Sequence, residues 1–401
     1  MNARILLLCL WPFMVNAQGF AGLGTDADGF SVPTADPGFD FPNDHGPHPD
    51  YRIEWWYLTA NMTGPDGTPY GLQWTLFRSA LAPVAGDGWT APQLWMGHAA
   101  VTTPDAHFVT ERLARGGIGQ AGVTADPFEA WIDDWSLAGP DFGDLRMRAS
   151  GPDFAYDVAL NAAGPLIFHG QDGFSVKSAQ GQASYYYSQP FYTLSGTLQL
   201  PDGPVEVTGT AWLDREWSSQ PLSDNQTGWD WFSLSFDSGD KLMGFRLRQT
   251  GGSYYTSGTW ITATGDATPF PDGAFNATPL DTATVAGMAT GMAAEATVRN
   301  VAAIATATVP DTAITSAGTA RGARAIATTG MATAARIATS IAWAGTTRPT
   351  GITGTAGSGS GSISTTCSSA AGTGSTIRGT IACRMFTAPI AGSGIMTTCC
   401  S

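Results

Sequence analysis

The chain has 401 residues, of which 33 are acidic and 19 basic, giving a net charge of −14. An acidic chain with only two lysines offers no basic surface for phosphate groups, which argues against nucleic-acid binding and against docking on anionic membranes. All ten tyrosines and all but one of the 14 tryptophans precede Leu280. We therefore expect the function to reside before that residue.

The first residues predict export. Met1–Arg4 is a short basic start, residues 5–15 are apolar apart from Pro12, and small residues surround position 17. This is the pattern of a signal peptide covering residues 1–17, the alternative being an uncleaved N-terminal anchor. The apolar run is too short to span a bilayer, and no later segment qualifies. We therefore expect a secreted or periplasmic protein with no transmembrane segment after cleavage.

Alternating apolar and polar positions predict strands from about Phe41, after a flexible lead-in at residues 18–40. The predicted strands at residues 53–62 and 70–76 form a hairpin around the turn Gly64-Pro65-Asp66-Gly67. The same pattern recurs later. Further strands are predicted at residues 197–200, 205–212, 231–236, 242–248 and 254–261. Closely spaced strands with tight turns indicate an all-β protein of barrels or sandwiches.

A rough division near Pro190 separates two β units, at residues 41–190 and 191–275. Residues 276–401 are dominated by Ala, Thr, Gly and Ser, whose codons mostly begin with A or G. We predict that a frameshift near residues 270–285 produced this tail; the alternative is a genuine low-complexity extension. Translating the other reading frames of the gene tests this, because neither frame would restore an aromatic-rich strand pattern if the hypothesis were wrong.

The segment from Phe41 to Tyr57 is rich in titratable groups. His45 and His48, with Asp44 and Asp50, are ligand types that suit a divalent metal. The prolines and the glycine among them favour instead a rigid loop before the first strand. We therefore expect no metal site, and nothing in the sequence indicates a cofactor.

Glu54 opens the first predicted strand beside Trp55 and Trp56. A carboxyl group in apolar surroundings has a raised pKa and can donate a proton. Alternatively, Glu54 pairs with Arg52 or Arg78 and closes one end of a barrel.

The run Tyr185-Tyr186-Tyr187 is a second candidate region. On a strand, Tyr185 and Tyr187 point to one face and Tyr186 to the other. One face could line a cavity in which phenol groups bind a ligand; the alternative is core packing with the hydroxyl groups at the rim.

The third region contains Trp212-Leu213-Asp214-Arg215-Glu216-Trp217, followed by Gly228–Phe232. Tryptophan faces stabilise cations, and carboxyl groups transfer protons. Asp214 and Glu216 share one face of a strand while Arg215 points the other way. The alternative is an ion-paired corner that joins strands. His98, His107 and His169 have no partner nearby in the sequence, so structural roles are expected.

The motifs of these regions, in this order, resemble the AttH-like lipocalin family, also called predicted secreted hydrolases and related to the carotenoid hydratases. The resemblance runs from about Phe41 to Ile261. The motifs are PNDHGPHPDYRIEWWYLTANM, GLQWTLFRSAL, LWMGHAAVT, ARGGIGQAGVTADPFEAWIDDW, ASYYYSQP, AWLDREWSSQPL and GWDWFSL. The resemblance implies two lipocalin-like β-barrels in tandem, the second incomplete in this chain. In the hydratases a His follows the Asp of the motif that contains Asp214, where this chain has Arg215, which favours the secreted-hydrolase or ligand-binding branch.

These observations predict a lipocalin-like protein that binds an apolar lipid or isoprenoid at a barrel mouth and either hydrolyses or hydrates it. The alternatives are a non-enzymatic component of an ABC transport system, carotenoid 1,2-hydration, and a purely structural envelope protein. One carboxyl group would donate a proton and another would activate water. The predicted catalytic residues are Asp214, Glu216 and Asp230, with His48 and Glu54 as second choices. The predicted ligand-binding residues are Trp55, Trp56, Tyr185, Tyr187, Trp217, Trp229 and Trp231.

Overall fold

The computed structural model describes residues 27–220, 223, 225–284, 297–307, 381–384, 389–390 and 394–400, and it describes side chains no further than Ala277. The predicted signal peptide lies outside these residues, as does most of the low-complexity tail. The described helices are two short 3-10 helices, η2 (Asn43–His45) and η3 (Gly88–Thr90). All other regular structure in these ranges is β-strand, which confirms the all-β prediction.

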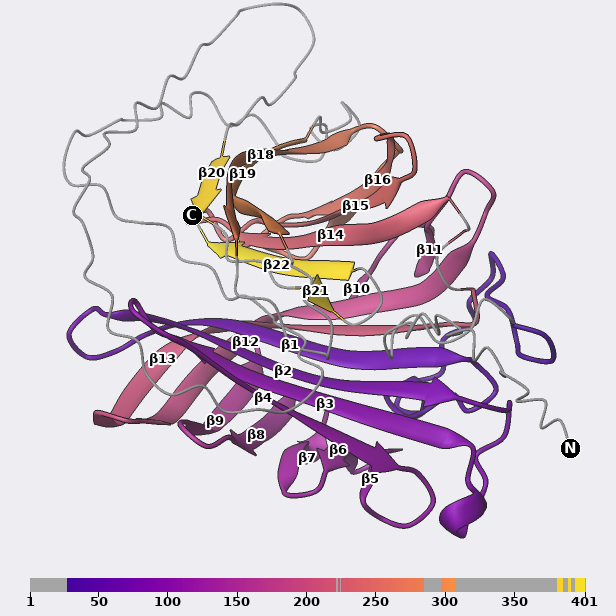
Figure 1. Ribbon diagram of the computed structural model, residues 1–401, viewed down its shortest axis with the longest axis horizontal. Coiled ribbons are helices and arrows are strands. Elements are labelled where there is room, and N and C mark those ends of the chain that lie inside the picture. The colour runs from indigo at the N-terminus through magenta and orange to yellow at the C-terminus, as the bar shows by residue number, and fades with distance from the viewer. Residues whose placement is uncertain are drawn as a thin grey trace, which may run out of the picture.

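Thirteen of the described strands form one large sheet. They are β1 (Ile53–Thr63), β2 (Pro69–Ala80), β3 (Gln93–Thr102), β4 (His107–Arg115), β5 (Ala121–Ala125), β6 (Phe128–Ile132), β7 (Trp135–Asp141), β8 (Asp144–Ser150), β9 (Ala155–Ala162), β10 (Ile167–Phe168), β11 (Phe174–Val176), β12 (Ala183–Leu200) and β13 (Gly203–Ser218). The order along the sheet is β4-β3-β2-β1-β13-β12-β9-β8-β7-β6-β5, with β10 and β11 paired to β12. Figure 1 shows this sheet as the lower part of the molecule, curled so that β5, β6 and β7 lie beneath β3 and β4.

Side chains bring the two ends of this sheet together into a nearly closed barrel. A Cβ atom at Gly97 of β3 would lie 2.7 Å from Ile132 and 3.3 Å from Trp135, so the missing side chain permits close packing between β3 and the β6–β7 hairpin. Arg112 of β4 lies over the Trp135 ring at 4.4 Å and pairs with Asp134 in the turn after β6. Charge and aromatic contacts therefore join the edges where strand pairing stops.

The predicted hairpins are present with the expected turns. β1 pairs antiparallel with β2 from Ile53↔Ser79 to Thr63↔Pro69. Gly67 adopts φ +83°, a conformation that side chains disfavour, and the Gly64 amide donates to the Thr68 carbonyl at 2.8 Å. Strand β12 likewise pairs with β13, and β14 with β15. Each pair is joined by a turn between two predicted strands, after residues 200 and 236.

A second, smaller sheet follows. Its strands are β14 (Gln226–Ser235), β15 (Lys241–Gln249), β16 (Tyr254–Ile261), β17 (Ala267–Phe270), β21 (Pro389–Ile390) and β22 (Gly394–Cys400), in the order β17-β16-β15-β14-β22-β21. A further sheet contains β18 (Phe275–Thr284), β19 (Thr297–Ala307) and β20 (Ile381–Arg384). The division expected near Pro190 falls inside β12, because β12 and β13 complete the first sheet. The first sheet thus ends with β13 at Ser218, and the second sheet begins with β14 at Gln226.

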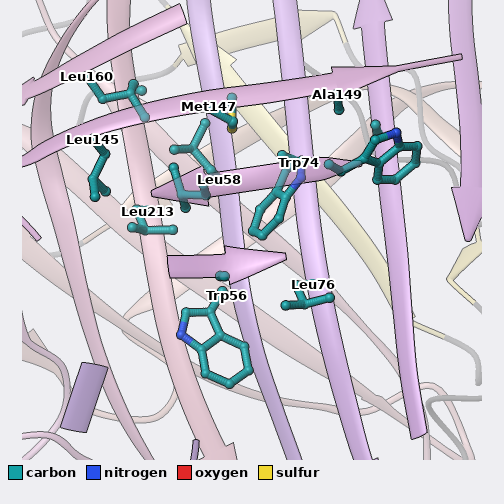
Figure 2. Close-up of a cluster of buried hydrophobic side chains, with 14 of the residues drawn as sticks. Trp56, Leu58, Trp74, Leu76, Leu145, Met147, Ala149, Leu160 and Leu213 are labelled. Atoms are coloured by element: carbon teal, nitrogen blue, oxygen red, sulfur yellow. The ribbon is translucent and has the colours of Figure 1, made fainter. Parts of the chain in front are cut away.

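The barrel interior is filled by large side chains. Trp56, Trp74 and Trp135 are completely buried there. Figure 2 shows Trp56 and Trp74 among Leu58 and Leu76 of the same strands, Leu213 of the adjacent β13 and Met147 of β8. Burial of such side chains is the main stabilising contribution to the fold. The interior of the first barrel is thus a packed core.

The outside of β1, β12 and β13 forms a second core with the smaller sheet. In Figure 1, β14, β15 and β16 lie above these strands. Tyr57, Tyr186 and Trp212 from the first sheet pack there against Trp231 and Phe245 from the second. We call this contact the intersheet interface.

Candidate functional site

Strand alternation places the predicted site residues in two separate clusters. On β13, Leu213 and Trp217 belong to the barrel core, whereas Trp212 belongs to the intersheet interface. Arg215 therefore points into the barrel, and Asp214 and Glu216 point to the interface, as alternation predicts. The two clusters lie on opposite faces of the same strands.

The interior cluster is centred on Glu54, which is completely buried. Its carboxylate accepts hydrogen bonds from Arg78 Nε at 2.9 Å, from Arg215 at 2.7 Å and from the His48 ring at 2.6 Å. The His48 ring also stacks on Trp217 with 4.0 Å between ring centres. Glu54 is thus an ion-paired group at one end of the barrel. This agrees with the alternative prediction that Glu54 pairs with Arg78.

The charges of this cluster set its protonation. Burial alone would raise the pKa of Glu54, but Arg215, His48 and Arg78 outweigh it and hold the pKa well below its usual value. The shift is opposite to the raised pKa that its apolar neighbours predicted. The pKa of His48 is raised, because Glu54 and Asp44 outweigh its burial. Ion pairing, including the predicted alternative partner Arg78, reverses the effect of burial on the pKa of Glu54.

The loop before β1 places its two histidines against different partners. His45 stacks on Phe142 at 4.0 Å and shares a hydrogen bond of 2.7 Å with the Tyr187 hydroxyl. Burial lowers its pKa to about 3. His48 instead contacts Asp44 at 3.1 Å. Within the described ranges, no three His, Cys, Asp or Glu side chains are grouped as metal ligands.

The interface cluster is centred on Asp214, which is 1% exposed. Its carboxyl group accepts hydrogen bonds from Ser188, from Trp212 Nε1 at 2.6 Å and from the Tyr186 hydroxyl at 2.9 Å. The Tyr186 hydroxyl in turn accepts a bond from Trp231 Nε1 at 3.0 Å. In the described part of the chain, no lysine or arginine forms an ion pair with Asp214.

This environment raises the pKa of Asp214 to about 7. Burial is the main cause, and the nearby charge of Glu216 adds to it, while the hydrogen bonds from Ser188, Trp212 and Tyr186 act in the opposite direction. A carboxyl group with this pKa can both donate and accept a proton near neutral pH.

The sequence did not predict the role of His169. His169 contacts Ser188 Oγ at 2.7 Å through Nε2 and Thr259 Oγ1 at 2.9 Å through Nδ1. Ser188 donates its only proton to Asp214, so His169 Nε2 must carry a proton and Nδ1 must accept one from Thr259. Burial lowers the pKa of His169 to about 3, in agreement with this neutral form. Each group therefore donates a hydrogen bond to the next: Thr259 to His169, His169 to Ser188, and Ser188 to Asp214.

One sequence signal could have found Ser188. The YYYS motif and the WLDREW motif lie on neighbouring strands, and Ser188 is directly opposite Asp214. His169 follows β10 and Thr259 lies on β16, far away in the sequence, so no local spacing predicts that they meet.

The other predicted carboxylates are ion-paired. Glu216 faces the interface with Asp214, but it contacts Lys177 Nζ at 2.8 Å and accepts a bond from Ser184. Asp230 is paired with Arg246 and Arg248 at 2.5 Å each. It alternates with Trp231 along β14 and thus points away from Asp214. The structure therefore brings together Asp214 and Glu216, and it separates both from Asp230, His48 and Glu54.

The predicted ligand-binding aromatics are also divided. Trp56, Tyr185, Tyr187 and Trp217 belong to the packed barrel core. Trp231 lies in the intersheet interface, with Trp55 and Trp229 partly buried beside it. The split of the tyrosine run between the two faces is confirmed. The candidate site lies at the intersheet interface rather than at a barrel mouth.

A nearly closed antiparallel barrel followed by a second, smaller sheet defines a lipocalin-like protein. The chain belongs to the AttH-like family, whose model matches residues 32–320.

Two solved structures are similar to this chain. An AttH protein from Nitrosomonas europaea is 32% identical, with a TM-score of 0.62, over 70% of this chain and 87% of that one. Kievitone hydratase from Nectria haematococca is 12% identical, with a TM-score of 0.47, over 73% of this chain and 84% of that one. Comparison with curated proteins finds no significant match.

Proposed function

We propose that this protein binds an apolar ligand at the intersheet interface and uses Asp214 to hydrate or hydrolyse it. One observation carries the proposal. Asp214 is buried among aromatic rings, has three neutral hydrogen-bond donors and has a pKa of about 7. A carboxyl group held in this way is a general acid and base, which an ordinary ion-paired aspartate is not.

The proposed chemistry for hydration is a balanced addition of water. Protonated Asp214 transfers its proton to one carbon of an alkene, and a water molecule adds to the other carbon. The proton lost by that water returns to the Asp214 carboxylate. Trp212 donates its ring N–H to Asp214 and Trp231 donates its own to Tyr186, and the faces of these rings would stabilise the positive charge that develops on the ligand. Glu216, charged and paired with Lys177, would orient the water.

Binding requires the ligand to enter between the sheets, because Asp214 is almost inaccessible in this structure. The neutral hydrogen-bond donors around Asp214 and the aromatic side chains of the intersheet interface suit an uncharged lipid or isoprenoid. We further propose that the protein works outside the cytoplasm, as its N-terminal sequence predicts. No helix among the described residues is long and apolar enough to span a membrane.

A carrier without catalysis is the second candidate. This candidate is favoured by the complete hydrogen bonding of Asp214. A buried carboxyl group with all its hydrogen bonds satisfied can have a purely structural role, here that of joining the two sheets. Such a protein would act as a component of an ABC transport system of the cell envelope.

Incubation with a lipid extract distinguishes these candidates. Native mass spectrometry measures bound ligand. Mass spectrometry of the extract detects either a hydration product heavier by one water or two hydrolysis products whose masses together exceed that of the ligand by one water. We expect Asp214→Asn to retain ligand binding and to lose turnover. Asp144→Asn, the same change at an exposed strand position, is the matched control and should keep both. Binding without turnover in the unmodified protein would establish the carrier, and neither binding nor turnover would refute both candidates.

A further inference from the structure

The outer face of β1, β2 and β3 continues the face that carries Asp214. Strand pairing aligns Asp214 with Tyr57, Tyr57 with Thr75, and Thr75 with His98. Three strand spacings separate Asp214 from His98, a distance of about 14 Å. One row of side chains thus runs from the candidate catalytic group across three more strands.

This face is buried although it carries polar groups. His98 is 6% exposed and Gln73 is 3% exposed. Beside them, Ile53, Phe77 and Met96 form a small apolar cluster, and Trp55 packs against both this cluster and the intersheet interface. An apolar surface is therefore continuous between the two ends of the row.

Four buried polar atoms on this face have no hydrogen-bond partner among the described residues. They are Trp55 Nε1, Gln73 Oε1, Ser79 Oγ and His98 Nε2. Gln73 uses its amide nitrogen to bind Thr75, at 3.1 Å, which leaves its oxygen as an acceptor. Glu111 lies 4.0 Å from His98 Nε2, beyond hydrogen-bond distance. Native proteins satisfy nearly all buried polar atoms, so four unpartnered atoms on one face indicate a polar partner.

The chemistry of the face defines that partner. Trp55 offers a donor and Gln73 an acceptor, and a neutral His98 can supply either, since burial lowers its pKa to about 4. The outward positions of β1, β2 and β3 between Ile53 and Thr59, Gln73 and Ser79, and Leu94 and Ala100 carry no charged residue, and Glu111 of β4, 4.0 Å from His98, disfavours an anionic ligand group. A hydroxyl group both donates and accepts, and it carries no charge.

We propose that His98 and Gln73 recognise a hydroxyl group at the far end of an elongated, uncharged apolar ligand whose other end lies at Asp214. This inference rests on the proposed binding at the intersheet interface and names the ligand class. It assigns to His98 a recognition role in place of the structural role expected from its sequence.

The test uses the full chain and two simple probes, the ten-carbon α,ω-diol and the ten-carbon primary alcohol. Their affinities are measured by displacement of the neutral fluorophore N-phenyl-naphthylamine. His98→Phe and Gln73→Leu replace the polar groups by apolar groups of similar size. Each should weaken diol binding by about tenfold, the factor expected for one buried hydrogen bond. Binding of the alcohol should change by less than about twofold, because its single hydroxyl group can occupy the Asp214 end.

His107→Phe is the matched control. His107 is a half-buried histidine whose buried Nε2 also has no partner among the described residues, and it pairs with Thr102, four residues beyond His98 on β3. His107→Phe should leave the affinities for the diol and for the alcohol unchanged. Equal loss of both probes, loss in the control, no loss in either variant, or no binding of the diol by the unmodified protein would overturn the inference. If thermal unfolding shows that His98→Phe does not fold, Gln73→Leu decides alone.

The outcome is separable from the proposed catalysis. A diol-specific loss in these variants without any turnover of lipids leaves the recognition role intact and refutes only the chemistry. Turnover that depends on Asp214 but not on His98 or Gln73 refutes only the recognition role.

Discussion

Replacing Asp214 by Asn should stabilise this protein at alkaline pH while removing its proposed activity. The pKa of Asp214 is about 7 in the folded protein, against an ordinary value of 3.8. The folded state therefore holds a proton that the unfolded state has released between these two values. Because the folded state binds more protons there, stability falls as the pH rises from about 4 to about 7 and is then constant.

The size of the effect follows from the same two values. At ~1.4 kcal/mol per pH unit, the ionised carboxyl group costs about 4 kcal/mol above pH 7. Asn has nearly the same shape and carries no charge, so Asp214→Asn escapes this cost. The Asn amide nitrogen cannot accept the hydrogen bond that the Tyr186 hydroxyl donates to Asp214. Loss of this bond reduces the gain in stability by about 1 kcal/mol. We expect a net gain of about 2–4 kcal/mol at pH 8.5, shrinking to within about 1 kcal/mol of zero near pH 4.

Urea denaturation of both proteins, followed by circular dichroism from pH 4 to pH 9, measures this difference. Other titrating groups contribute equally to both proteins, so the difference isolates Asp214. A gain independent of pH, or a loss of stability at pH 8.5, would refute the raised pKa and with it the acid–base role.

Three further substitutions test other parts of the description. Ser188→Ala removes a hydrogen bond that favours the Asp214 carboxylate, so the pKa of Asp214 should rise further, and the pH range over which stability falls should extend above 7 in the same urea titration. Glu54→Gln leaves Arg78 and Arg215 buried without their anion and should cost about 3–5 kcal/mol at pH 7; a cost below about 1 kcal/mol in urea denaturation would show that the pair is not buried. Because the pKa of Glu54 is held below its usual value, this difference should shrink only in acid. Trp135→Ala should cost about 3–5 kcal/mol through the cavity it creates, as measured by urea denaturation, and an unchanged midpoint would contradict the packed barrel.

The strands and their turns are encoded locally, which is why the sequence predicted them. Apolar residues at every second position of β1 and β2, with a glycine turn between them, specify a hairpin without any distant contact. The same alternation placed Asp214 and Glu216 on one face and Arg215 on the other. It also separated Tyr186 from Tyr185 and Tyr187, as the structure shows.

The environment of each carboxyl group was decided only by the tertiary structure. Glu54 and Asp214 both lie beside tryptophans in the sequence, yet one meets two arginines inside the barrel and the other meets neutral donors between the sheets. Their pKa values consequently move in opposite directions. Sheet closure also brings His169 and Thr259 to Ser188, across 90 residues of chain between His169 and Thr259. Local alternation determines which way a side chain points, but burial and charge depend on strands that the sequence does not place next to one another.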